Sequence, residues 1–161
     1  MAQFTQQLEG WQLEPTAVIR LLQKIQDTGQ PLRDVRGVEP YRGILTGLNE
    51  AFMFDHQTYK RFLSEDPGCS GLLRPFFRGQ DFCRWYSAPS GFWMIAIASS
   101  ENRTWPWSGA GAGAEAAFAK TYPAIHTHLS RYKDALQARQ DQGRYWWELR
   151  SCAYWAEFDR P

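Results

Sequence analysis

The sequence lacks any long hydrophobic run, since no stretch approaches the roughly 18 consecutive apolar residues of a membrane-spanning helix. Its N-terminus also lacks the basic start and apolar stretch of a secretory signal. Neither sign of charge dominates, because 18 Lys and Arg against 17 Asp and Glu leave a net charge of +1. We therefore expect a cytoplasmic protein with no membrane partner, and charge alone predicts no other partner.

Cysteine and histidine are scarce and are not spaced for metal binding. The three cysteines, Cys69, Cys83 and Cys152, are widely separated and contain no Cys-x-x-Cys pair, which favours reduced thiols over a disulfide framework. His126 and His128 lie two positions apart on a predicted helix, so they point to nearly opposite sides of its axis. We expect no metal site.

Motifs for catalysis and nucleotide binding are also missing. The run GAGAGA at 109–114 resembles a dinucleotide-binding fingerprint, but no apolar strand leads into it, and Gly43 and Gly47 lack a following Gly-Lys-Ser/Thr. No lysine follows Asp or Glu at the spacing of the nuclease core. No two prolines adjoin, as the Asn-Pro-Pro-aromatic pocket of amino-methyltransferases requires. We expect no catalytic residue and no cofactor in this chain.

Aromatic residues and arginine are abundant instead. Aromatics make up 16% of the chain, with eight Trp, enough for a dense core and for surface rings that stack on a flat ligand. Lysine occurs at only four positions, and the other 14 of the 18 basic residues are arginine. Arginine grips phosphates and guanine edges with two hydrogen bonds, although codon usage that favours arginine gives the same bias.

Regularly spaced apolar residues predict two long amphipathic helices. The first covers residues 14–29, with Gly29 as its stop. The second begins at Pro123 and ends at Gly143. The apolar faces consist of Val18, Leu21, Leu22 and Ile25 in the first helix and of Ile125, Leu129, Tyr132 and Leu136 in the second.

Short stretches between these helices predict two antiparallel strand pairs. The first pair joins residues 41–45 to 51–55 around a glycine turn, and the second joins 82–86 to 92–98. At 161 residues the chain has room for one domain of ordinary size. We therefore predict a single α+β domain over residues 1–161, with the strands flanked by the two helices.

Two further helical segments and one loop complete the expected map. Asp55 is placed to cap a helix over residues 56–64, and a short helical piece is expected over 71–74. Residues 99–113 are small, polar and rich in glycine, and the chain should become helical near Ala114. Because such residues bury little surface, we expect this loop to be the most mobile interior segment and the first cut by protease.

Five blocks, in order along the chain, span nearly all of it: 22-LQKIQDTGQPL-32, 41-YRGILTGLNEAFMFD-55, 74-RPFFRGQDFCRWY-86, 122-YPAIHTHLSRYKDALQAR-139 and 145-YWWELR-150. Taken together, they resemble the TaqI-like C-terminal specificity domain. That domain is the target-recognition part of type II restriction–modification enzymes and of adenine-specific DNA methyltransferases, which act in phage defence. Five ordered blocks are far more specific than any one glycine motif.

The resemblance implies a non-catalytic domain that grips double-stranded DNA and selects its sequence. In such enzymes an upstream domain binds S-adenosylmethionine and methylates a flipped adenine, so the implied partners are double-stranded DNA and that methyltransferase domain. Family members continue beyond the position of Pro161, so we expect this chain to be a truncated target-recognition domain. The purified chain should show neither methyl transfer nor nuclease activity.

The resemblance also implies which residues contact DNA. Two of the five blocks match family motifs. The block at 41–55 contains G-x-x-T-G-x-N, and the block at 74–86 contains Arg-Gly-x-Asp, which ends at Asp81. Such blocks bring backbone, short polar side chains and arginines close to phosphates or guanine. The implied DNA-binding residues are Arg42, Gly43, Thr46, Gly47, Asn49, Arg74, Arg78 and Gly79.

Two alternatives stay open. The segment Gly47-Leu48-Asn49 is equally consistent with a plain turn, because asparagine favours turns, and Arg78 with a structural ion pair to Asp81. The whole chain is also consistent with a non-catalytic protein-docking or carbohydrate-binding module, because exposed rings stack on sugars or fill pockets of partner proteins. Salt-dependent binding to DNA separates these functions.

Overall fold

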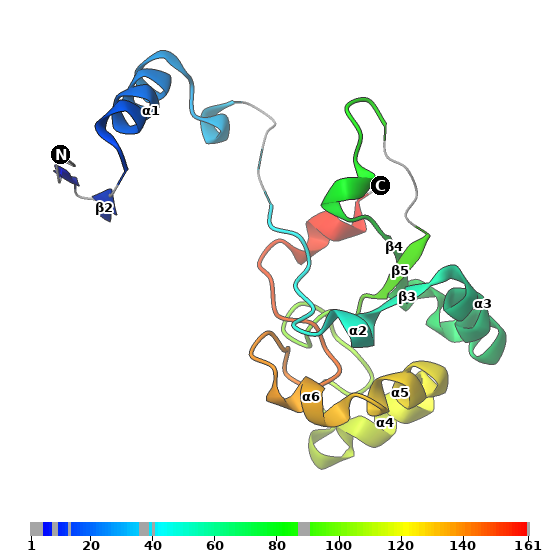
Figure 1. Ribbon diagram of the computed structural model, residues 1–161. Coiled ribbons are helices and arrows are strands. Elements are labelled where there is room, and N and C mark those ends of the chain that lie inside the picture. Colours follow the sequence, from blue (N-terminus) through cyan, green and yellow to red (C-terminus); the bar gives the residue numbers. More distant parts are fainter. Residues whose placement is uncertain are drawn as a thin grey trace. The chain divides into compact units, whose positions relative to one another are not determined.

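The computed structural model describes residues 5–7, 10–12, 14–35, 39, 41–86 and 91–160 (Figure 1). The chain divides into two compact units, Met1–Arg42 and Gly43–Pro161. The expectation of one domain over residues 1–161 stays a prediction.

The first unit contains a two-stranded hairpin and one long helix. Strand β1 (Thr5–Gln7) pairs antiparallel with β2 (Gly10–Gln12), a pair that the sequence analysis missed. Helix α1 (Thr16–Thr28) follows Pro15 and stops at Gly29, and the 3-10 helix η1 (Leu32–Asp34) comes after it. The predicted helix over 14–29 is confirmed, but its apolar face stays exposed within this unit: Val18, Leu21, Leu22 and Ile25.

A three-stranded antiparallel sheet organises the second unit. Its strand order is β3 (Met53–Asp55), β5 (Phe92–Ile95) and β4 (Leu73–Phe76), with β5 in the centre. In register, Phe54 faces Trp93 on one side of β5, and Arg74 faces Met94 on the other. Together with the helices around it, this sheet confirms the predicted α+β class.

The first predicted hairpin is wrong. Residues 41–46 form no strand, and the next residues form the short helix α2 (Asn49–Phe52) before β3 begins. Ala51 and Phe52 are adjacent and both completely buried, whereas a strand sends adjacent side chains to opposite faces. A helical turn lets both of them reach the core, so only the last three residues of the expected strand become β3.

The second predicted hairpin is wrong in its first strand. Strand β5 forms within the expected 92–98 range, but residues 82–86 form no strand and follow the 3-10 helix η3 (Gly79–Asp81). The pairing with β5 is taken by β4, which lies earlier in the chain and carries Pro75 at the sheet edge, where proline is tolerated. The helical piece expected over 71–74 is also misplaced, because the 3-10 helix η2 (Pro67–Leu72) ends before Leu73.

The other helices follow the expected map with one interruption. Helix α3 (His56–Glu65) is capped by Asp55, whose carboxylate accepts a 2.8 Å hydrogen bond from the Thr58 N–H. Helix α4 (Ala114–Thr121) begins where predicted, after the 3-10 helix η4 (Gly111–Gly113). The predicted long helix from Pro123 splits into α5 (Pro123–Ser130) and α6 (Lys133–Ala138), and the 3-10 helix η5 (Trp155–Asp159) follows near the C-terminus.

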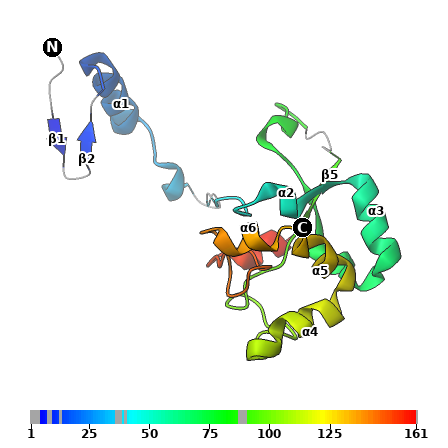
Figure 2. The same cartoon turned by 60° about the horizontal axis from the view of Figure 1, so that its bottom comes forward.

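Aromatic rings form the centre of the second unit. Trp147 stacks on Phe118 with ring centroids 5.0 Å apart, and Trp107 meets both rings edge-on. Helices α4 and α5 lie side by side around this cluster (Figure 2), and Ile125 and Leu129 of α5 are completely buried. Most of the tryptophans in this unit therefore serve the core.

The loop before α4 is packed over much of its length. Ser99 and Trp107 are completely buried and Trp105 is nearly so, which offsets the entropy lost on ordering them. The reason given for an early protease cut over 99–113 therefore does not hold for these buried residues. It still applies to the exposed residues 101–104, 106 and 109–113, and the early cut stays a prediction.

Candidate functional site

The predicted residues at the start of the second unit form a turn that is closed by its own polar groups. The Thr46 hydroxyl donates a 2.6 Å hydrogen bond to the Asn49 side-chain oxygen, and the Thr46 carbonyl accepts one from the Arg139 guanidinium. Thr46 is buried, whereas Arg42 and Gly43 are exposed. The polar groups of Thr46 thus hold the turn.

Gly47 is required by this turn. Its φ angle is 65°, in the left-handed region that favours glycine, and an added Cβ would lie 3.1 Å from the Arg139 Cδ and 3.2 Å from the Asp141 Cβ. The turn interpretation of Gly47-Leu48-Asn49 therefore has a clear physical basis. Whether the same turn also approaches DNA stays a prediction.

Arg139 connects this turn to the C-terminal segment. Arg139 is 8% exposed, and its guanidinium donates to the carbonyl oxygens of Thr46, Trp146 and Glu148 and lies 4.8 Å from the centroid of the Phe52 ring. Burial lowers the pKa of Arg139 to about 10. The sequence analysis missed this residue, because no spacing marks an arginine that serves backbone carbonyls inside a core.

Glu148 is a second buried charged group that the sequence analysis missed. Its carboxylate is completely buried and accepts hydrogen bonds from the Trp107 indole at 2.9 Å, from the Ser100 N–H at 3.0 Å and from the Ser100 hydroxyl. The N–H groups of Arg144 and Tyr145 also donate to it. Glu148 therefore ties the 99–108 loop to the 144–148 turn and serves the fold.

Arg74 lies on β4 beside an open cleft of about 610 Å³. Its guanidinium forms a 2.5 Å ion pair with the Asp159 carboxylate, and Asn102, Arg103 and Trp155 line the same cleft. The Arg103 guanidinium lies 4.7 Å from the centroid of the Trp105 ring. Two guanidinium groups against one carboxylate give this cleft a net attraction for anions.

Arg78 forms the ion pair that was left open as an alternative. Its guanidinium contacts the Asp81 carboxylate at 3.1 and 3.3 Å, its N–H donates to the same carboxylate at 2.7 Å, and it lies 4.7 Å from the centroid of the Phe92 ring. The Asp81 side chain is 8% exposed and that of Arg78 is 39% exposed. A Cβ on Gly79 would meet nothing within 4 Å, so the space beside Arg78 is open.

Residues 77–86, here called the aromatic loop, expose several large rings. Phe82, Trp85 and Tyr86 keep 62%, 83% and 68% of their surface exposed, and Phe77 is also exposed. The Arg84 guanidinium lies 5.1 Å from the centroid of the Trp85 ring. In Figure 1 this segment is the green part of the chain that follows β4. The sequence predicted a strand over residues 82–86, so the surface that these rings form was not expected.

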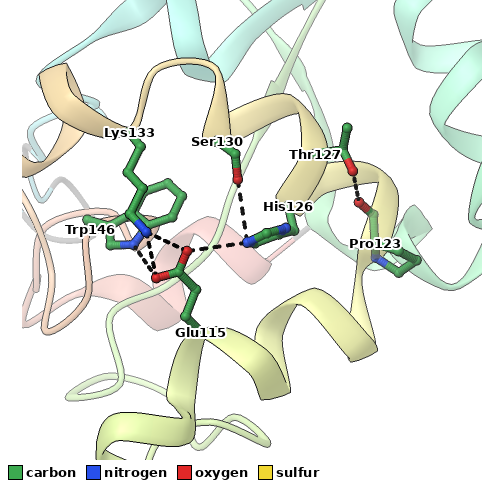
Figure 3. A network of polar contacts seen from close by, with 7 residues as sticks. All are labelled: Glu115, Pro123, His126, Thr127, Ser130, Lys133 and Trp146. Atoms are coloured by element: carbon green, nitrogen blue, oxygen red, sulfur yellow. Dashed lines mark hydrogen bonds and ion pairs between the residues drawn. The ribbon is translucent and has the colours of Figure 1, made fainter.

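A serine, a histidine and a glutamate also meet between the helices (Figure 3). The Ser130 hydroxyl and the Glu115 carboxylate both approach the Nε2 atom of His126, at 3.4 and 3.5 Å. A nucleophilic triad instead needs the serine and the acid on different ring nitrogens, so this arrangement cannot relay a proton between them.

Lys133 gives this cluster a structural role. Its ammonium contacts both Glu115 oxygens, at 2.7 and 2.8 Å, and this contact holds the pKa of Glu115 below its usual value. The Trp146 indole lies 3.5 Å from the same carboxylate. Glu115 therefore links helices α4, α5 and α6 to the C-terminal segment.

Within the described ranges, no three His, Cys, Asp or Glu side chains converge in a way that could hold a metal ion. No helix in the described part of the chain is long and apolar enough to cross a membrane. Comparison with protein-family models, curated proteins and solved structures found no match. The resemblance of the five sequence blocks to a specificity domain, and the DNA contacts it implies, therefore stay predictions.

Proposed function

We propose that the second unit binds double-stranded DNA and acts as the target-recognition part of an adenine-specific DNA methyltransferase or bifunctional restriction–modification enzyme. The observation that carries the proposal is the excess of positive charge in residues 74–86. Three arginines, Arg74, Arg78 and Arg84, lie in this segment, and its only carboxylate, Asp81, is buried against Arg78. Residues 74–86 therefore offer cations to a polyanion without an exposed carboxylate among them, and the carboxylate that Arg74 meets, Asp159, comes from outside the segment.

The arginines in this surface have different tasks. The cleft that contains Arg74 and Arg103 suits a backbone phosphate, because its two guanidinium groups outweigh the single carboxylate of Asp159. Arg78 is held in one orientation by Asp81, and a fixed guanidinium loses little entropy when it meets a guanine edge or a phosphate. Phosphate contacts hold the duplex, whereas a contact between Arg78 and a guanine edge selects the base sequence.

This division of tasks fits a larger enzyme. S-adenosylmethionine and the methyl-transfer chemistry belong to the upstream domain, which takes the target adenine out of the stack. The present chain then holds the duplex in one register so that this adenine meets that domain. The hydroxyl and the carbonyl of Thr46 are already paired with Asn49 and Arg139. The turn at 46–49 therefore has a structural task, which is to hold the start of the second unit in place.

Arg78→Gln tests the proposal in the full chain. Fluorescence anisotropy with several 30-base-pair duplexes of different sequence, at two salt concentrations, should show salt-dependent binding of the unmodified chain. A phosphate contact predicts that the variant weakens binding on all duplexes and lowers the salt slope by about 1. A base contact predicts a loss of roughly 1–3 kcal/mol that depends on the duplex sequence.

Arg131→Gln is the matched control, because Arg131 is exposed at the end of α5, outside the proposed surface. It should leave the affinity unchanged. Absence of salt-dependent binding in the unmodified chain would overturn the proposal. Equal affinities for Arg78→Gln and the unmodified chain, with a lower melting temperature for the variant, would restrict Arg78 to its structural ion pair.

Protein docking is the second candidate function, and the exposed rings favour it. Tyrosine, tryptophan, phenylalanine and arginine are enriched at protein–protein interfaces, and all four occur in the aromatic loop. Such docking depends on buried apolar area and responds weakly to salt. Salt-independent association with a protein, without affinity for duplex DNA, would therefore favour it.

A further inference from the structure

The aromatic loop holds its rings away from the core although the unit buries most other rings. Trp85 is 83% exposed, whereas every other tryptophan whose side chain is described is buried or half-buried. Its neighbours Phe82 and Tyr86 are also largely exposed. The centroids of the Phe77 and Phe82 rings also lie 5.8 Å apart. Several large exposed rings on one loop of an otherwise well-packed unit mark an interaction surface.

The loop is held in a defined shape at two points. The Arg78–Asp81 ion pair closes the turn at its start, and Asp81 also accepts a hydrogen bond from the Arg78 N–H. Near its end, the Cys83 N–H donates a 2.8 Å hydrogen bond to the Tyr86 carbonyl. Rings on a closed loop lose less entropy on binding than rings on a free chain.

Charge selects the partner for these rings. Arg84 lies against the Trp85 ring, and Asp81, the one carboxylate in residues 77–86, is buried and paired with Arg78. The loop therefore presents cations and flat apolar faces together. Nucleic acid offers the matching surface, with phosphates outside and stacked bases inside.

We propose that the aromatic loop inserts Trp85 against an unstacked base step of duplex DNA, with Arg84 on the adjacent phosphate. This inference rests on the proposed DNA binding and adds a mechanism to it. Apolar side chains that wedge between bases open the step and kink the duplex, most easily at flexible pyrimidine–purine steps. The loop would thus read how easily a step deforms in addition to any base edge read by Arg78.

Two readouts on the full chain distinguish this wedge from a phosphate contact. The duplexes carry 2-aminopurine in place of the adenine of TA, CA and AA steps, because this base brightens when it unstacks. Trp85→Ala should reduce affinity about 10- to 100-fold, as expected for one base–aromatic stack, with an unchanged salt slope. The unmodified chain should raise 2-aminopurine emission at TA or CA steps, and Trp85→Ala should abolish the rise.

Tryptophan emission gives a second, independent signal. DNA should quench part of the emission of the unmodified chain, and Trp85→Phe should remove that part. Trp93→Phe is the matched control, because Trp93 is half-buried and stacks on Tyr59 with ring centroids 3.7 Å apart. The quenching by DNA should persist in this variant.

Each outcome separates the two proposals. If Trp85→Ala binds DNA as tightly as the unmodified chain and gives the same 2-aminopurine signal, the wedge is wrong and DNA binding stands. If the unmodified chain binds no duplex even at low salt, both proposals fall. If it binds no duplex but forms dimers that Trp85→Ala abolishes, the loop docks on a second copy of the chain instead.

Discussion

The 99–108 loop and the aromatic loop both carry aromatic rings, yet the second unit buries the rings of one and exposes those of the other. In the 99–108 loop, the indole of Trp107 donates to the Glu148 carboxylate, and that of Trp105 donates to the Ala98 carbonyl at 2.8 Å. Among the described residues, the Trp85 indole has no such acceptor, and its ring is covered on one side by Arg84. Both buried tryptophans of the 99–108 loop thus have an acceptor inside the unit, whereas Trp147 is buried with its indole N–H unpaired, so an acceptor accompanies burial in this loop without being required for it.

Removal of Glu148 should have the largest effect on stability, because its carboxylate accepts the hydrogen bonds that hold the 99–108 loop. Glu148→Ala leaves the Trp107 indole and the Ser100 N–H without an acceptor inside the core. We expect a loss of about 3–5 kcal/mol in the free energy of unfolding, measured by urea titration. Glu101→Ala is the control, because Glu101 is exposed in the same loop. Equal midpoints for the two variants would show that Glu148 does not hold the loop.

The second prediction compares one tryptophan from each loop. Trp107→Ala removes a completely buried ring from the aromatic cluster and should cost about 3–5 kcal/mol. Trp85→Ala removes an exposed ring and should change stability by less than about 0.5 kcal/mol. Thermal unfolding followed by circular dichroism measures both. A comparable loss for Trp85→Ala would mean that the aromatic loop supports the fold, which would remove the contrast between the loops.

The smallest effect concerns the ion pair between Glu115 and Lys133. The Lys133 ammonium lowers the pKa of Glu115, so the folded state gains stability above the usual value of 4.5 and loses it as pH falls through the lowered value. Lys133→Met should therefore cost less than about 1 kcal/mol at neutral pH, because both side chains are partly exposed, and the cost should vanish in acid.

Urea titrations at several pH values measure this difference between the variant and the unmodified chain. Lys120→Met serves as the control, since Lys120 is exposed on α4. A cost that stays constant into acid would assign the role of Lys133 to its packing against the Trp146 ring, 5.4 Å from the ammonium.

The sequence predicted the helices far better than the strands. Helix positions follow from local spacing and caps, as with the Asp55 cap of α3 and the start of α4 near Ala114. Strand pairing depends on distant segments, and β5 pairs with β3 and β4 rather than with the nearer residues 82–86.

The candidate site was predicted only in part, for a similar physical reason. The Arg78–Asp81 pair is local, three positions apart, and could be anticipated. Arg139 and Glu148 could not, because their partners lie up to 93 and 48 positions away and a buried charge leaves no periodic pattern. Residues 82–86 of the aromatic loop were mistaken for a strand because aromatic residues favour strands whether or not a partner strand exists.

The most direct measurement of the central claim is a selection from a random duplex library by the full chain at low salt. The account predicts that the bound fraction converges on one short sequence, and that Arg78→Gln or Trp85→Ala relaxes the preference at separate positions. Bound duplexes that keep the composition of the starting library over successive rounds, or no bound fraction at all, would contradict a target-recognition function.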